Sequence, residues 1–161
     1  MSYYPPVAFS FTVSISGNRA DVDHGFQTVS GLDADRSVME LAEGGENRFV
    51  HKLPGRTKAK NLVLKRGIVL VSSPLFDWCK SVFEADLAQT ITTKDVTVSL
   101  LDPKQKPAIT WSLSSAWPVR WEVGAFNAQA NEVAVETIEM AYGRVERKVA
   151  QVPAGANAQG L

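Results

Sequence analysis

The sequence predicts a mainly β fold, an antiparallel barrel or sandwich of about seven strands with one inserted α-helix. Three observations carry this prediction. Apolar and polar residues alternate over residues 9–16, which is typical of a half-buried antiparallel strand. The alternation returns on both sides of a proline-rich turn at 102–107, which indicates a hairpin. Only residues 72–88 space their apolar side chains with a helical period.

Length and composition set the outer limits. A chain of 161 residues, 45% hydrophobic and 21% charged, fits one domain with its own core. We expect this domain to span residues 1–161, with its core at about 9–147 and short extensions at both ends. The formal net charge is zero, so bulk charge gives no argument for nucleic acid or an anionic membrane as partner.

The first half of the chain reads as strands and turns. A second strand is expected at 26–30, and Gly31 follows it as a bend or bulge. Residues 36–41 and 49–53 can pair as a hairpin across a glycine-containing turn. The LPGR segment at 53–56 predicts a further turn, and a strand then begins at Leu62.

The predicted helix has a well-marked start. Ser73 can accept a hydrogen bond as the N-cap, Pro74 suits the first helical position, and Asp77 suits the positive end of the dipole. One broad face is apolar and is predicted to be buried; it comprises Leu75, Phe76, Trp78, Cys79, Val82, Phe83, Ala85 and Leu87.

Period-two patterning resumes after the helix, with strands at 96–100 and 109–113. Because proline cannot donate to a ladder, Pro118 predicts an irregular connection from about 117 to 131. The apolar residues of a last strand at 133–142 change parity, which predicts a bulge near Glu136 or burial of both faces. The tail from Val149 is weakly patterned and is expected to be loose in an isolated subunit.

The inventory of chemically active residues is small. His24 and His51 are isolated from any ligand or nucleophile motif, so both are expected to be ordinary surface or packing residues. Cys79 is the single cysteine, which excludes an internal disulfide, and its place on the apolar helix face predicts an inert buried thiol.

Neither the paired acids nor the glycines form a site by themselves. The pairs Asp33 with Asp35 and Glu136 with Glu139 would need a cleft to act as a hydrolase dyad, and the glycines at 44–45 lack phosphate-loop spacing. We therefore expect no catalytic, metal-binding or cofactor-binding residues, no cofactor and no enzymatic activity.

Charge is segregated along the chain. Seven acids and one base occupy residues 21–46, and seven bases with no acid follow at 48–66. Such a basic run could contact phosphates, but only Phe49 lies near it for base stacking, so a solvated or partner-facing hairpin is the favoured interpretation. The first residues have no basic, apolar leader and no stretch is long enough to span a membrane, so we expect no signal peptide and no membrane anchoring.

Several motifs resemble the contractile-phage tail tube family, in the family's order and spacing. They are VSGL at 29–32, ELAEGGEN at 40–47, HKLPGR at 51–56, NLVLKRG at 61–67, AWPVRW at 116–121 and NEVAVETIE at 131–139. The resemblance runs from about residue 9 to 145, and the part from 40 to 67 is the most specific.

The resemblance implies a structural protein made in the bacterial cytoplasm and assembled in a phage tail or extracellular injection particle. It implies homohexameric rings that stack into an inner tube, with sheath, baseplate or spike, terminator proteins and a luminal cargo as partners. A tube-initiator ring at the baseplate stays open as an alternative, as does a monomeric β-barrel module that binds an anionic polymer.

In this family the long hairpin that matches residues 40–56 reaches toward the neighbouring ring. The charge segregation then places acids and bases at a subunit boundary, where opposite charges would set the register between rings. The predicted contact residues are Glu40, Glu43, Glu46, Phe49, Leu53, Arg56, Lys58 and Lys60.

Overall fold

The computed structural model describes residues 10–16, 22–42, 44–45, 49–68, 73–85, 88–129 and 133–150. Ten elements follow one another along these residues. They are β1 (Ser10–Ile15), β2 (Val22–Ser30), β3 (Ala34–Ala42), β4 (Val50–Ala59), β5 (Leu62–Gly67), α1 (Pro74–Glu84), β6 (Lys94–Leu101), β7 (Pro107–Val123), β8 (Val135–Ala141) and β9 (Arg144–Val149).

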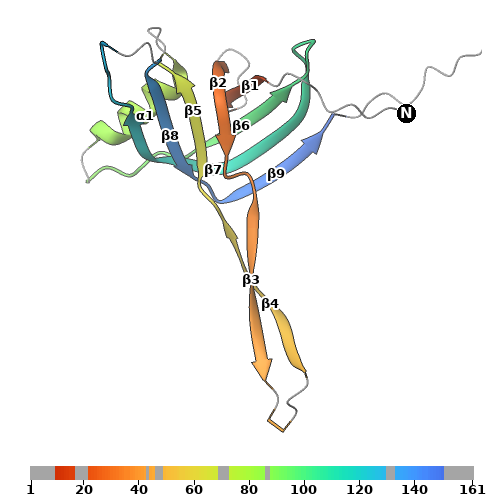
Figure 1. Cartoon of the computed structure of the whole chain (residues 1–161). Coiled ribbons are helices and arrows are strands. Elements are labelled where there is room, and N and C mark those ends of the chain that lie inside the picture. Colours follow the sequence, from red (N-terminus) through yellow and green to blue (C-terminus); the bar gives the residue numbers. More distant parts are fainter. Residues whose placement is uncertain are drawn as a thin grey trace, which may run out of the picture.

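Seven strands form one antiparallel sheet in the order β6-β1-β2-β5-β8-β7-β9. A further pairing of β6 with the first half of β7 joins the sheet to itself, so that six of these strands close into a barrel. The remaining strands, β3 and β4, form a separate two-stranded sheet that projects away from the barrel (Figure 1). The predicted mainly β fold with one helix is confirmed.

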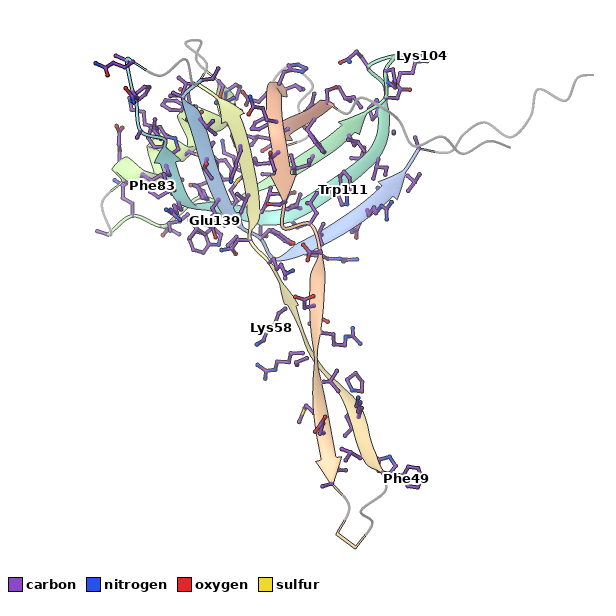
Figure 2. The ribbon with its side chains drawn as sticks, in the orientation of Figure 1. Phe49, Lys58, Phe83, Lys104, Trp111 and Glu139 are labelled. Atoms are coloured by element: carbon purple, nitrogen blue, oxygen red, sulfur yellow. The ribbon has the colours of Figure 1, made fainter. Side chains whose placement is uncertain are left out.

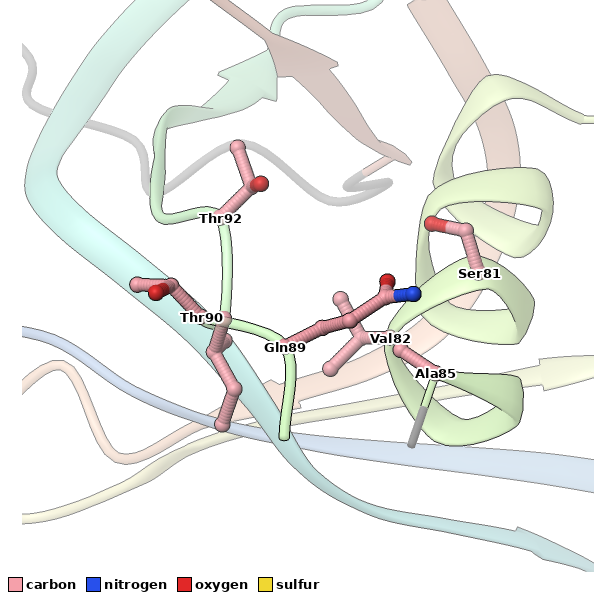
Figure 3. A pocket seen from close by; sticks show the side chains of 7 residues that line it. Ser81, Val82, Ala85, Gln89, Thr90 and Thr92 are labelled. Atoms are coloured by element: carbon pink, nitrogen blue, oxygen red, sulfur yellow. The ribbon is translucent and has the colours of Figure 1, made fainter. Parts of the chain in front are cut away.

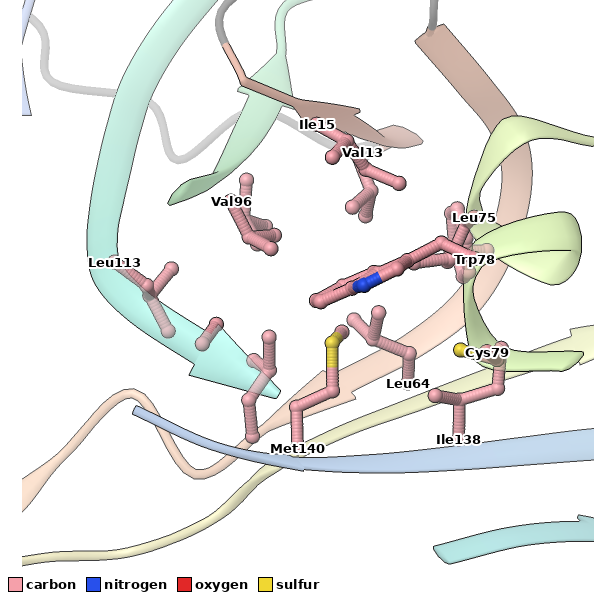
Figure 4. Close-up of a cluster of buried hydrophobic side chains, with 14 residues drawn as sticks. Val13, Ile15, Leu64, Leu75, Trp78, Cys79, Val96, Leu113, Ile138 and Met140 are labelled. Carbon is pink, nitrogen blue, oxygen red and sulfur yellow. The ribbon is translucent and has the colours of Figure 1, made fainter. Parts of the chain in front are cut away.

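The core fills the barrel interior and includes the inner face of α1. Figure 4 shows the helix side chains reaching toward those of the strands. The cluster comprises Val13, Ile15, Phe26, Leu62, Leu64, Leu75, Trp78, Cys79, Val96, Val98, Leu113, Ala116, Ile138 and Met140. The helix therefore covers one side of the barrel and contributes side chains to its hydrophobic core.

The start of α1 is as the sequence predicts. The Ser73 hydroxyl accepts a hydrogen bond from the backbone N–H of Phe76 at 3.1 Å, and Pro74 is the first helical residue. The prediction that Phe83 is buried is wrong, because its side chain is 45% exposed and lies on the outer side of the helix (Figure 2). Leu87 lies outside the described residues.

Two predicted breaks in the strands are wrong. β4 continues through Pro54 and Gly55, where a turn was predicted, and a register shift opposite β3 just after Pro54 absorbs the irregularity, since proline is tolerated at bulges and in edge strands. β7 likewise continues through Pro118 to Val123, and a register shift opposite β8 absorbs the irregularity between Pro118 and Arg120. β9 is a strand that the sequence pattern does not predict.

The parity change before β8 has a different cause from the two predicted, a bulge near Glu136 or burial of both faces, since only every second residue of β8 is buried. The pairing of β8 with β5 is regular from Leu62↔Met140 to Gly67↔Val135, so β8 carries no bulge there. Glu136 instead occupies an inward position in line with Ile138 and Met140, and it is buried. An acid at a core position is what interrupts the apolar pattern.

Glu136 belongs to a buried network centred on Arg66. The Arg66 Nε donates to Glu136 Oε2 at 3.0 Å, Nη1 donates to Asp23 Oδ1 at 3.2 Å, and Nη2 donates to Ser73 Oγ at 3.0 Å. Asp23 Oδ2 also accepts from the backbone N–H of Leu75 at 3.1 Å, and Trp121 Nε1 donates to Glu136 Oε1 at 2.8 Å. The network fixes the first turn of α1 to strands β2, β5 and β8.

Along the part of the chain that the structure describes, no helix is both long and apolar enough to cross a membrane.

Candidate functional site

The projecting sheet continues a pair of barrel strands. Ser30 pairs with Val63 at the end of β2 and β5, and Ala34 pairs with Ala59 at the start of β3 and β4. Three residues separate these pairs on each side, so the register is the same in the barrel and beyond it. Strands β2 to β5 therefore build one long ribbon whose outer part, β3 and β4, we call the stem.

The stem leaves the barrel at a tightly packed junction. Gly31 has a φ of +85°, and a Cβ there would overlap the carbonyl oxygen of Asn61, so only glycine fits. The Gly31 carbonyl accepts a hydrogen bond from the Tyr142 hydroxyl at 2.9 Å, and Asn61 Nδ2 donates to Glu139 Oε1 at 2.8 Å. These contacts tie the junction to the β8–β9 segment and set the direction of the stem.

An ion pair closes the base of the stem. Lys60 Nζ lies 2.5 Å from Asp33 Oδ2 and 3.5 Å from Asp35 Oδ2, all three side chains being exposed. The hydrogen bond between them lowers the pKa of Asp33 and raises the pKa of Lys60. Lys60, predicted as a contact to another subunit, thus has partners within its own chain.

Large apolar side chains are exposed on both faces of the stem. Met39 lies opposite Leu53 on one face, and Val38 lies opposite Pro54 on the other. Figure 2 places Phe49, 68% exposed, toward the far end of the stem. A two-stranded ribbon is marginally stable alone in water, and apolar patches of this kind mark contact surfaces. The stem is therefore the best candidate for an assembly site.

The charges segregated in the sequence meet across the stem. The register places Glu40 opposite Lys52 and Asp35 opposite Lys58, so acidic β3 and basic β4 face each other within one chain. Arg56 and Lys58 are exposed, whereas Glu43 and Glu46 lie outside the described residues. Opposite charges across a ribbon support its register by a few tenths of a kcal/mol to about 1 kcal/mol per pair.

Few of the described side chains are of the kinds that catalyse reactions or bind metals. His24 and His51 are exposed on different strands, and among the described residues no group of three or more His, Cys, Asp or Glu could hold a metal. A pocket of about 310 Å³ beside α1 is lined by residues including Ser81, Gln89 and Thr90 (Figure 3). None of the described residues that line it has an acidic, basic or histidine side chain.

The Cys79 thiol should be unreactive in the folded protein. Burial, together with the nearby Glu136 carboxylate, raises the pKa of Cys79 from 9.0 to about 12. The thiolate fraction at pH 8 is then about one in 10,000 instead of about one in ten. We expect iodoacetamide to leave native protein unlabelled by mass spectrometry and to label urea-unfolded protein quickly. Rapid labelling of native protein would show that the α1 face opens.

Comparisons with known proteins agree with this picture. A chain of the anti-feeding prophage baseplate, in a 6-fold symmetrised structure, is 30% identical, with a TM-score of 0.76, and the match covers 94% of this chain and 100% of that one. A chain of the PVC sheath-tube complex of an extracellular contractile injection system is 30% identical, with a TM-score of 0.73, covering 91% and 93%. Hcp1 from Flavobacterium johnsoniae shares the fold at 14% identity, with a TM-score of 0.52, covering 86% and 94%. A comparison with curated protein sequences gives no match.

The barrel, the helix α1 and the stem thus define a tail tube or tube-related protein of contractile injection systems. The sequence profile of the family described as T4-like virus tail tube protein gp19 matches residues 7–146. The chain belongs to this family.

Proposed function

We propose that the protein is the repeating subunit of an inner tube, forming hexameric rings that stack into a conduit for DNA or protein cargo. The observation that carries the proposal is the stem, whose exposed apolar side chains no described residue of the same chain covers. A second copy can cover them. Contacts between unlike surfaces close into a ring when the rotation closes and continue as a filament when it does not.

The proposed assembly accounts for the other partners. A surrounding sheath would contact the outside of the tube, and baseplate or spike and terminator proteins would contact its ends, in a phage tail or an extracellular injection particle. The similarity to a chain of a sheath-tube complex supports this arrangement. No step of such a mechanical role needs a cofactor, an enzymatic activity or a membrane anchor.

Negative-stain electron microscopy of the purified full-length protein tests the proposal directly. Rings of one diameter with six-fold symmetry, stacking into tubes as the protein concentration rises, are the expected result. Featureless monomers at high concentration would contradict it. Monomers that bind a polyanion in a salt-sensitive manner would instead favour a module that grips an anionic polymer.

A ring at one end of the tube is a second candidate. The similarity to chains of a baseplate and of a PVC sheath/tube terminator structure, each at 30% identity, favours it as an alternative. A tube initiator would form single rings that nucleate a different tube protein, whereas a repeating subunit would polymerise alone. The length distribution of the assemblies separates the two.

The stem should be needed for assembly and dispensable for the barrel. Replacing Phe49 and Leu53 together by serine removes exposed apolar side chains without touching the core. We expect the melting temperature to change by less than about 3 °C, since surface substitutions usually stay within about 0.5 kcal/mol. Sedimentation should show loss of assembled protein at least ten-fold. Normal tubes from this variant would show that the contact surface does not lie on the apolar side chains of the stem.

A further inference from the structure

Among the described strands, none pairs with the outer edge of β9. β8 and β9 lie along the same side of β7 in one register, since Trp117 pairs with Ala141 and Ser114 pairs with Arg144. On the opposite side of this segment, β5 pairs with β8, but no strand in the described part of the chain pairs with β9. The backbone N–H and C=O groups on that edge are open to a strand from outside the chain.

The chain's own β4 would be the natural partner, because it continues β5. Figure 1 shows instead that the stem projects down from the barrel, whereas β9 runs along the lower edge of the barrel and away from the stem. If the pairing of β5 with β8 continued, Lys58 would lie opposite Arg144, and Pro54, which has no N–H, would lie opposite Lys148. Like charges directly opposite each other are unfavourable, and a proline removes a ladder hydrogen bond. The two strands therefore have a physical reason to separate.

The charge of the open edge indicates what can fill it. β9 carries three basic side chains, Arg144, Arg147 and Lys148, against one acid, Glu146, and all four are exposed. The charged residues of β4, the strand that diverges from β9, are all basic. A strand that pairs with β9 should therefore be acidic and should itself have a free edge.

One strand of this chain meets both requirements. β3 carries two acids, Asp35 and Glu40, against one base, Arg36, and among the described strands only β4 pairs with it, which leaves its outer edge without a described partner. β3 has nine residues and β9 has six, so β3 can span the edge of β9 completely. We propose that β3 of one copy adds as a strand to the β9 edge of a second copy.

This proposal rests on the proposed function and names the surfaces that meet in it. The contact joins two different surfaces, so each copy can offer its stem to one neighbour and its β9 edge to another. Main-chain hydrogen bonds give such a contact its strength, and the charges of β3 and β9 select the register and the partner.

Charge reversal in two variants tests the contact. The first variant is Arg147→Glu with Lys148→Glu, which makes the β9 edge acidic. The second exchanges Glu40→Lys and Lys52→Glu, which reverses the charge on β3 but keeps opposite charges across the stem. Lys104→Glu with Lys106→Glu, on the exposed turn between β6 and β7, is the control with the same change in net charge as the first variant.

Each variant alone should lose at least ten-fold in sedimentable assembly, while the control assembles like wild type. An equimolar mixture of the two variants should regain at least half of the wild-type assembly, because each then offers the other a complementary edge. Normal assembly of either variant, or no recovery in the mixture of folded variants, would overturn the proposal. Failure of the wild-type protein to assemble at all would instead overturn the proposed function, and this contact with it.

A cross-linking arm decides the matter if either variant melts early. Glu40→Cys is combined with Lys148→Cys in a Cys79→Ser background, and assembled protein is treated with a long bismaleimide. A ladder of covalently linked oligomers is expected. Wild-type protein and each single-cysteine protein are the controls and should give no ladder. If the double-cysteine protein forms tubes but gives no ladder, β3 does not lie along β9.

Discussion

Replacing Arg66 by methionine is expected to destabilise the fold by about 3–5 kcal/mol. Arg66 is 4% exposed and donates hydrogen bonds to Asp23, Glu136 and Ser73, so its removal leaves two carboxylates buried without their cation. Their burial is then uncompensated, which costs several kcal/mol in a low-dielectric interior. A chain of this length should lose about 10 °C or more in melting temperature, measurable by calorimetry or circular dichroism.

Lys65→Met is the matched control, because Lys65 is the exposed neighbour of Arg66 on β5. It should melt within about 2 °C of wild type. The triple variant Arg66→Met, Asp23→Asn and Glu136→Gln should recover part of the loss, since it removes the unpaired charges as well as the arginine. An Arg66→Met protein that melts like wild type would show that the network contributes nothing to stability.

This network also marks the limit of the sequence interpretation. Arg66 stands at the end of a basic run that reads as a solvated face, and its partner Glu136 lies 70 residues away. No local pattern says that the two meet in a core. The parity change around Glu136 is the available signal. It predicts a bulge or burial of both faces, whereas its cause is a buried acidic side chain.

Sequence rules predicted correctly the features that depend on residues close together in the chain. The N-cap at Ser73 and the hairpin that became β6 and β7 were predicted, because both depend on neighbouring residues or a short turn. They failed for Pro54 and Pro118, where strand pairing at a free edge or beside a bulge outweighed the breaking tendency of proline. That the stem leaves the barrel depends on the junction at Gly31 and Asn61, which sequence alone does not place together.

The second large effect is expected at the tryptophan of α1. Trp78→Ala should cost about 3–5 kcal/mol, because its side chain is 4% exposed and fills the barrel beside the strands. The substitution also removes the hydrogen bond from Trp78 Nε1 to the Thr92 carbonyl at 3.3 Å, leaving that acceptor to find water. Thermal unfolding of the purified protein should show a loss of about 10 °C or more, with a matching fall in the denaturant midpoint.

Phe83→Ala on the same helix is the control that separates burial from aromatic character. Phe83 is also a large aromatic residue, but its 45% exposure means that truncation leaves a smaller cavity and loses less transfer free energy. It should therefore cost well under half as much as Trp78→Ala in the isolated subunit. Equal destabilisation by the two truncations, at concentrations where the protein is monomeric, would show that the Phe83 side chain is buried in the subunit and that α1 buries its whole apolar face. If Phe83→Ala is mild in the monomer but impairs assembly, its exposed ring is covered by another copy.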